Sequence, residues 1–151
     1  MLTKILIAFG LMAACVVLHA VGLTSALRWL TRSQASITSK YGGQLKLLIV
    51  VACWTVLIHL VEIAVWAVLY AVGGGMPDLQ TALYFSAVTY TTTGYGDLVL
   101  PEQWRMVGGV EALTGILMCG WSTGFFFAIF NQIFIRDTGV RAPAGEAGGG
   151  S

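Results

Sequence analysis

The clearest chemistry in the sequence lies in residues 91–97, which read Thr-Thr-Thr-Gly-Tyr-Gly-Asp. A cation that has lost its water shell needs a substitute shell of oxygen atoms, which stacked backbone carbonyls from several chains can supply. Turning successive carbonyls toward one axis requires backbone angles that L-residues resist, whereas Gly94 and Gly96 adopt φ > 0 at little cost. The Thr92 hydroxyl would add an oxygen at the inner end. The stretch therefore predicts a cation site built mainly from main-chain oxygens.

The neighbours of the two glycines have supporting roles in this interpretation. The Tyr95 ring would point away from the axis and pack behind the carbonyls, where its hydroxyl would help to hold them at a fixed diameter. Asp97 and Asp78 would raise the cation concentration at the outer mouth. Thr93 is β-branched, and its hydroxyl could compete for hydrogen bonds or water behind the carbonyls.

Four apolar segments would position this site. Three of them, near 5–27, 45–72 and 106–135, are long enough to cross a bilayer, which takes about 20 residues as helix. The fourth, 79–91, would rise only roughly 20 Å as a helix, about half to two-thirds of the hydrocarbon core. We therefore expect an all-α membrane protein with three transmembrane helices and a re-entrant helix that turns back into the loop 92–97. The negative C-terminal end of the re-entrant helix would face the inner mouth of that loop.

The composition agrees with this class. Of 151 residues, 57% are hydrophobic and 10% are charged, and the mean hydropathy is +0.82. Soluble domains usually carry about a quarter charged residues. The 8 Lys and Arg residues against 7 Asp and Glu residues leave no basic excess for nucleic-acid binding. The cysteines lie in apolar runs, which argues against a secreted disulfide framework: Cys15, Cys53 and Cys119.

Basic residues predict the orientation. Most of the 8 Lys and Arg residues flank two loops that the positive-inside rule places in the cytoplasm: Arg28, Arg32, Lys40, Lys46, Arg136 and Arg141. The loop between the second and third spans then faces outward with the N-terminus, and the C-terminus is cytoplasmic. We expect a multi-pass protein of the bacterial plasma membrane in contact with lipids, with Trp29 and Trp104 as interfacial anchors. The alternative, a cleaved signal peptide at 1–20, would invert the loop against the basic residues.

The stretch 91–97 resembles the selectivity filter of the potassium-channel family, whose signature is Thr-Val-Gly-Tyr-Gly followed by Asp. The similarity extends from the second span through Asp78, the aromatic pair at 84–85 and Trp104 to the glycine-bearing third span. It implies a homotetramer, because one row of carbonyls cannot surround an ion, and passive conduction of K⁺ through four loops. The filter would run from Thr92 to Gly96, with K⁺ held at four of its positions: Thr92, Thr93, Gly94 and Tyr95.

One position departs from the family pattern, since Thr93 stands where Val or Ile is usual. We expect a potassium-selective cation channel, and a channel that discriminates weakly between K⁺ and Na⁺ is the alternative. No cofactor is expected besides the permeant ion. The apolar segments and the resemblance together divide the chain into an N-terminal helix (1–30) peripheral to the second span, a cytoplasmic loop (31–44), a pore domain (45–135) and a flexible tail (136–151). The pore domain would contain an outer helix (45–72), a pore helix (79–91), the filter (92–97) and an inner helix (106–135).

Ionisable residues inside apolar spans are costly and predict a role. His59 and Glu62 lie three apart on one helical face, so they can pair, either as a structural link to another span or as a proton sensor. Glu111 is expected near the level of the filter, where it would brace the pore helix or couple the third span to gating. Gly115 and Gly120 are candidate bending points. No span carries regularly spaced Arg or Lys, which predicts leak-like conduction.

Two other functions remain open. Residues 120–124 read Gly-Trp-Ser-Thr-Gly, which matches the G-x-S-x-G nucleophile elbow, with Ser122 as nucleophile and His19 or His59 as base. The elbow needs a strand, a sharp turn and a helix, whereas this copy lies in an apolar span, where its two glycines suit close helix packing. We therefore expect no enzyme. The other alternative is an accessory membrane subunit with a non-conducting loop.

Overall fold

The structure, a computed structural model, describes residues 2–33 and 41–138. Its elements are α1 (Leu2–Ser33), α2 (Tyr41–Gly73), α3 (Leu79–Tyr90), the short 3-10 helix η2 (Glu102–Trp104) and α4 (Arg105–Thr138). The described ranges contain no strand, so the predicted all-α class is confirmed.

Three helices are long and apolar enough to cross a membrane, as predicted, over Leu2–Arg32, Gly42–Gly73 and Glu102–Gln132. All three extend beyond their predicted limits, so both ends of the predicted loop 31–44 are helical and α4 continues into the predicted tail. Arg, Lys and Gln favour helix nearly as well as Leu, which lets a helix outlast its apolar stretch. The rest of the predicted loop and tail, with Lys40 and Arg141, lies outside the described residues.

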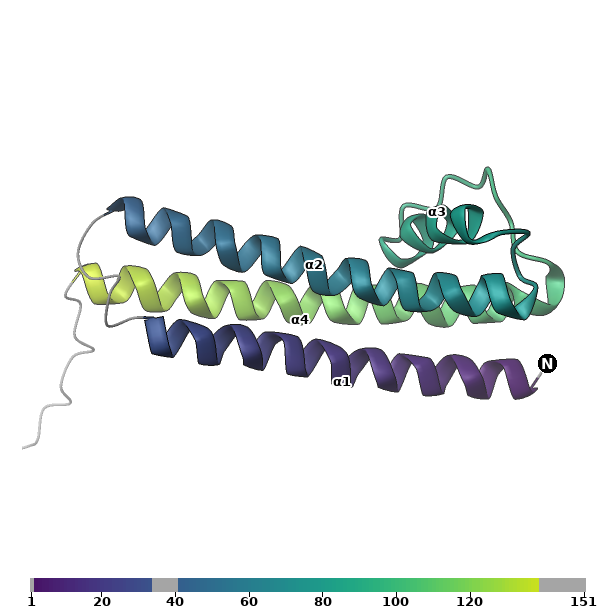
Figure 1. The fold of residues 1–151 in the computed structure, drawn as a ribbon, viewed down its shortest axis with the longest axis horizontal. Coiled ribbons are helices and arrows are strands. Elements are labelled where there is room, and N and C mark those ends of the chain that lie inside the picture. The colour runs from purple at the N-terminus through teal and green to yellow at the C-terminus, as the bar shows by residue number, and fades with distance from the viewer. Residues whose placement is uncertain (1, 34–40, 139–151) are drawn as a thin grey trace, which may run out of the picture.

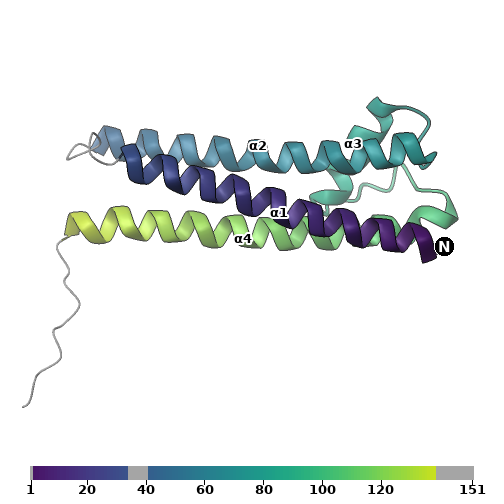
Figure 2. The same ribbon diagram turned by 60° about the horizontal axis from the view of Figure 1, so that its bottom comes forward.

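The long helices form a bundle with α3 at one end. α1 and α4 run in the same direction and α2 runs opposite to both (Figure 1). The start of α1 therefore lies at the same end as α3, and the ends of α1 and α4 lie at the other (Figure 2). α3 packs against α2 and α4. α1 packs against α2, where the sequence predicted it, and also against α4.

The core at the α3 end contains large aromatic side chains, including Trp66 and Trp104. Trp104 is only 4% exposed, so it is not the interfacial anchor that its place in the sequence predicted. The reason is local, because a Cβ at Gly73 would overlap the indole, and glycine leaves room for it. The Lys4 ammonium lies 4.1 Å from the centre of the Trp104 ring, a cation–π contact that ties α1 to η2.

α3 begins at a side-chain cap. The Asp78 carboxylate accepts hydrogen bonds from the Thr81 backbone N–H and from the Thr81 hydroxyl, each at 2.8 Å. These two bonds favour the ionised form and lower the pKa of Asp78. The cap satisfies a donor that the first turn of a helix leaves free, and it fixes where the short helix starts.

α3 ends in a Schellman motif. The Thr92 N–H donates to the Thr89 carbonyl at 2.9 Å, and the Thr93 N–H donates to the Val88 carbonyl at 2.9 Å. Thr92 holds the left-handed position of this motif with φ of 59°, where glycine is usual. α3 therefore ends at Tyr90, one residue before the predicted end.

α4 passes very close to this end of α3 at Gly115. A Cβ on Gly115 would overlap the main-chain carbonyl of Tyr90, the last residue of α3. Because the obstacle is backbone, no side-chain rotation would make room. A glycine at this position thus sets the depth at which α3 lies against α4.

Candidate functional site

The loop after α3 has an alternating backbone. Thr92, Gly94 and Gly96 have φ of 59°, 56° and 78°, whereas Thr93 and Tyr95 keep negative φ. In a strand, successive carbonyls point to opposite sides, and an alternation of handedness instead turns successive peptide planes toward one side. Gly94 and Gly96 thus have the left-handed backbone that was predicted for them. The left-handed backbone of Thr92 was not predicted, because it is the Schellman motif that imposes this conformation.

The threonine hydroxyls tie the loop to α3. The Thr91 hydroxyl donates to the Ala87 carbonyl at 2.7 Å, and its oxygen lies 2.9 Å from the Thr93 hydroxyl oxygen. Since the only hydroxyl proton of Thr91 is directed at Ala87, Thr93 is the donor in the second contact. The Thr93 hydroxyl, which the sequence singled out, therefore bonds to Thr91, the residue that directly follows α3.

The end of the loop, at Asp97, also contacts α3. The Tyr84 hydroxyl donates to Asp97 at 2.7 Å. A cavity of about 140 Å³ lies between α3 and the loop, lined by Tyr84, Phe85, Val88, Thr89, Gly94, Gly96, Asp97 and Leu98. The Tyr95 side chain is 71% exposed in the single chain, so the packing expected for its ring does not come from this chain's own described residues.

Glu111 is completely buried and joins three helices. It accepts a hydrogen bond from the Tyr70 hydroxyl of α2 at 2.7 Å and is also hydrogen-bonded to the Ser86 hydroxyl of α3. Ser86 also lies 2.8 Å from the Ile63 carbonyl as a donor, although a serine has only one hydroxyl proton. All three contacts have a proton when Glu111 is a neutral acid that donates to Ser86. The sequence placed Glu111 against the pore helix but did not identify Tyr70 and Ser86.

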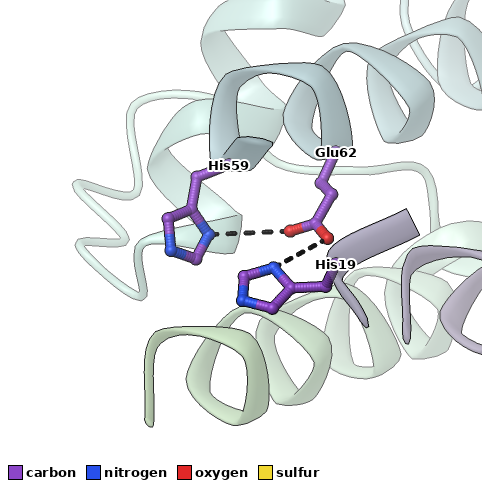
Figure 3. Close-up of side chains that lie close together, drawn as sticks. All are labelled: His19, His59 and Glu62. Carbon is purple, nitrogen blue, oxygen red and sulfur yellow. Dashed lines mark hydrogen bonds and ion pairs between the residues drawn. The ribbon is translucent and has the colours of Figure 1, made fainter. Parts of the chain in front are cut away.

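A second buried carboxylate, Glu62, lies between two histidines (Figure 3). One carboxylate oxygen is 3.1 Å from His19 Nδ1 on α1, and the other is 3.6 Å from His59 Nδ1 on its own helix, α2. Tyr90 of α3 donates its hydroxyl proton to the same carboxylate. The predicted pairing of His59 with Glu62 is present, and His19, expected only as a satisfied polar contact, belongs to the same cluster.

Ser122 of α4 closes this cluster into a ring. Its hydroxyl oxygen is 2.9 Å from His19 Nε2 and 3.1 Å from His59 Nε2, and His59 Nδ1 is 3.1 Å from the Tyr90 hydroxyl. The five side chains of the ring follow each other by hydrogen bonds in a fixed order: His19, Glu62, Tyr90, His59, Ser122 and back to His19. One proton for each contact gives a ring with no net charge. The sequence missed Tyr90 and Ser122 as members.

Ser122, His19 and Glu62 lie in the order of a hydrolase triad, yet the surroundings do not suit acyl transfer. Ser122 lies inside α4 rather than at a strand–turn–helix elbow. The neighbouring backbone N–H groups of a helix interior already bond to carbonyls one turn away, so they cannot stabilise an oxyanion. The arrangement can exchange protons or hold a cation instead.

A comparison with known families agrees with the loop geometry. The family described as ion channel, a two-transmembrane family that includes potassium channels, matches residues 47–132. The match covers more than half of the chain and runs from α2 through the loop to α4. It points to a protein that is not an enzyme and, with the three apolar helices, to a multi-pass membrane protein. Neither the curated proteins nor the solved structures contain a match to the chain. The chain belongs to the ion channel family.

Proposed function

We propose that the chain forms a homotetrameric, potassium-selective channel that passes ions passively. The observation that carries the proposal is the alternating sign of φ from Thr92 to Gly96, directly after a capped short helix. Such a backbone supports one row of carbonyls per chain, and four rows would surround a dehydrated ion. K⁺ would bind along the row at four positions: Thr92, Thr93, Gly94 and Tyr95.

The exposed Tyr95 supports a tetramer. An aromatic ring that is 71% exposed beside a row of carbonyls leaves the row without lateral support in a single chain. In the assembly, the ring of Tyr95 would pack against a neighbouring chain and hold the row at a fixed diameter. α3, re-entrant from the outer side, would direct its C-terminal end toward the inner mouth.

The orientation follows from charge. Asp78 and Asp97 lie at the end of the bundle that also holds the start of α1, and this end would face outward and attract cations. The basic residues at the opposite ends of the helices would face the bacterial cytoplasm. With no regularly spaced basic residues in a span, we expect leak-like currents that depend weakly on voltage.

The deciding experiment is the reversal potential of the purified protein in liposomes under a K⁺/Na⁺ gradient. We expect a value close to the K⁺ equilibrium potential. Gly96→Ala should abolish current or selectivity, because alanine resists φ of 78°. Gly109→Ala is the matched control, since no atom lies within 4 Å of a Cβ there. Absence of current from intact tetramers would favour the accessory subunit, and unchanged selectivity in Gly96→Ala would refute the filter assignment.

Substitutions at Thr93 would distinguish strong from weak selectivity for K⁺ over Na⁺. Thr93→Val removes the hydroxyl that bonds to Thr91 and places the usual apolar residue behind the carbonyls, so we expect a higher K⁺ to Na⁺ permeability ratio. Thr93→Ser keeps the hydroxyl and should keep the ratio of the natural protein. Equal ratios in all three proteins would show that the hydroxyl has no part in selectivity.

A further inference from the structure

We infer that His19, His59, Glu62 and Tyr90 form a binding site for a divalent transition metal ion of the Zn²⁺ type. These residues come from α1, α2 and α3. Their side chains form a site that is separate from the row of carbonyls in the loop. The inference stands on the geometry of the cluster and does not depend on conduction or on selectivity for potassium.

Several of the donor atoms already have nearly the right spacing. Zn²⁺ binds histidine nitrogen at about 2.0–2.1 Å, so two ligands of a tetrahedral site lie about 3.3 Å apart. The two histidine Nδ1 atoms are 3.1 Å and 3.6 Å from oxygens of the Glu62 carboxylate. The histidine and carboxylate ligand atoms all lie within 4.8 Å of one another. The Tyr90 oxygen, 3.1 Å from His59 Nδ1, is placed to be the fourth ligand.

The outer contacts orient both imidazoles for this role. Metal-bound histidines usually donate their other ring N–H to a protein acceptor, which fixes the tautomer. Here both Nδ1 atoms face Glu62, and both Nε2 atoms reach the single oxygen of Ser122, at 2.9 Å and 3.1 Å. A hydroxyl oxygen has two lone pairs and accepts both N–H groups. Ser122 on α4 thus holds both imidazoles so that their Nδ1 atoms face the same carboxylate.

Charge balance also suits a buried divalent ion. His19 and Glu62 are completely buried, and isolated charge is costly there. A carboxylate and a tyrosinate neutralise a divalent ion, so the ion can replace two protons of the neutral ring without changing its net charge. Neutral imidazoles, carboxylate and phenolate oxygens form a mixed nitrogen and oxygen set, which favours Zn²⁺ and its neighbours over K⁺ or Ca²⁺.

The cluster has an opening. The His59 side chain is 16% exposed, and together with Ser122 and Cys119 it lines an open groove between α2 and α4. The other buried carboxylate makes a useful contrast, because in the described part of the chain the side chains that bond to Glu111 are both hydroxyls. Without a nitrogen ligand, the Glu111 cluster is not expected to hold such an ion.

The test uses the full chain purified in detergent, stripped of metal with a chelator and titrated with Co²⁺. We expect one Co²⁺ per chain with the intense visible absorption of four-coordinate cobalt, and its loss when Zn²⁺ is added. Glu62→Gln is the informative variant. The amide still donates to His19 and accepts from Tyr90, so the ring of hydrogen bonds survives, while the anionic ligand is gone and the cobalt spectrum should disappear.

Glu111→Gln is the matched control and should bind Co²⁺ like the natural protein. Ser122→Ala should keep the spectrum but weaken binding about 10–100-fold, as losses of outer contacts do. Zn²⁺ should also raise the unfolding temperature of the natural protein and of Glu111→Gln, but not of Glu62→Gln.

Either of two results would overturn the inference: no four-coordinate cobalt in the intact natural protein, or an unchanged cobalt spectrum in Glu62→Gln. If Glu62→Gln fails to fold, as judged by helix content and particle size, His19→Asn replaces it under the same criterion. Because no ion flux is measured, failure here leaves the proposed channel function untouched, and failure of conduction leaves this inference standing.

Discussion

The bundle contains two buried carboxylates, Glu62 and Glu111, whose hydrogen-bond partners differ in kind. Each is completely buried, accepts a tyrosine hydroxyl and connects α3 to its neighbours. Glu111 meets hydroxyls, which can only share protons. Glu62 meets two imidazoles, which can accept a proton, donate one or coordinate an ion.

The two clusters therefore differ in how many arrangements of their protons satisfy all hydrogen bonds. At Glu111, three contacts are satisfied by one arrangement of protons. In the Glu62 ring, all protons can point either way around the circle, and both arrangements satisfy every contact. The family match covers α2 to α4 and leaves out α1, and it is α1 that contributes His19 to the ring. The first helix thus adds an imidazole to a buried carboxylate of the matched region.

The largest effect is expected at Gly115, which separates the two clusters. Glu111 lies one turn earlier on α4, and Tyr90 of the other cluster lies against Gly115 itself. Gly115→Ala would push the Tyr90 backbone away and loosen both clusters. We expect a loss at the upper end of the about 1–3 kcal/mol typical of overpacking, measured by thermal unfolding in detergent. Gly109→Ala should not be destabilised, and equal losses in the two variants would contradict the close approach.

Removing either carboxylate should have a smaller effect. Glu111→Ala leaves the Tyr70 hydroxyl unpaired, while Ser86 can still donate to Ile63. Glu62→Ala leaves His19 Nδ1 unpaired, while the Tyr90 hydroxyl can still donate to His59 Nδ1. We therefore expect each variant to lose about 1–3 kcal/mol of unfolding free energy, the cost of one unsatisfied buried group. A clearly larger loss in Glu62→Ala would show that His59 does not accept the Tyr90 proton.

The smallest effect on stability is expected at Asp78, which is exposed to solvent and caps α3. Its hydrogen bonds to Thr81 lower its pKa in the folded chain, so the cap stabilises α3 above the unfolded pKa and loses this contribution as the pH falls through the folded value. Unfolding followed from neutral pH to about pH 3 should show this loss in the natural protein. Asp78→Asn keeps a good cap without the titration, and an identical acid response in that variant would exclude Asp78 as its source.

Features of the fold that depend on neighbouring residues in the chain were predictable from the sequence. Apolar length predicted the three long helices, and the short span before Gly94 predicted α3. The partners of the buried carboxylates were not predictable in the same way, because they depend on how far each helix slides and turns against the next. Tyr90 meets Glu62 only because Gly115 admits the Tyr90 backbone so close to α4. Ser122 carried a signal, as a polar residue in an apolar span, but its motif pointed to the wrong chemistry.

The close approach at Gly115 also decides which motions α4 can make. A slide of one residue along α4 would bring a bulky side chain against the Tyr90 carbonyl, so the part of α4 above Gly115 can move only if α3 moves with it. At Gly120, by contrast, no atom of the described residues lies within 4 Å of a Cβ position, so no such contact holds α4 there. Of the two bending points expected from the sequence, the structure favours Gly120. We therefore predict that any bend in α4 occurs at Gly120, with the preceding part of the helix held against α3 at Gly115.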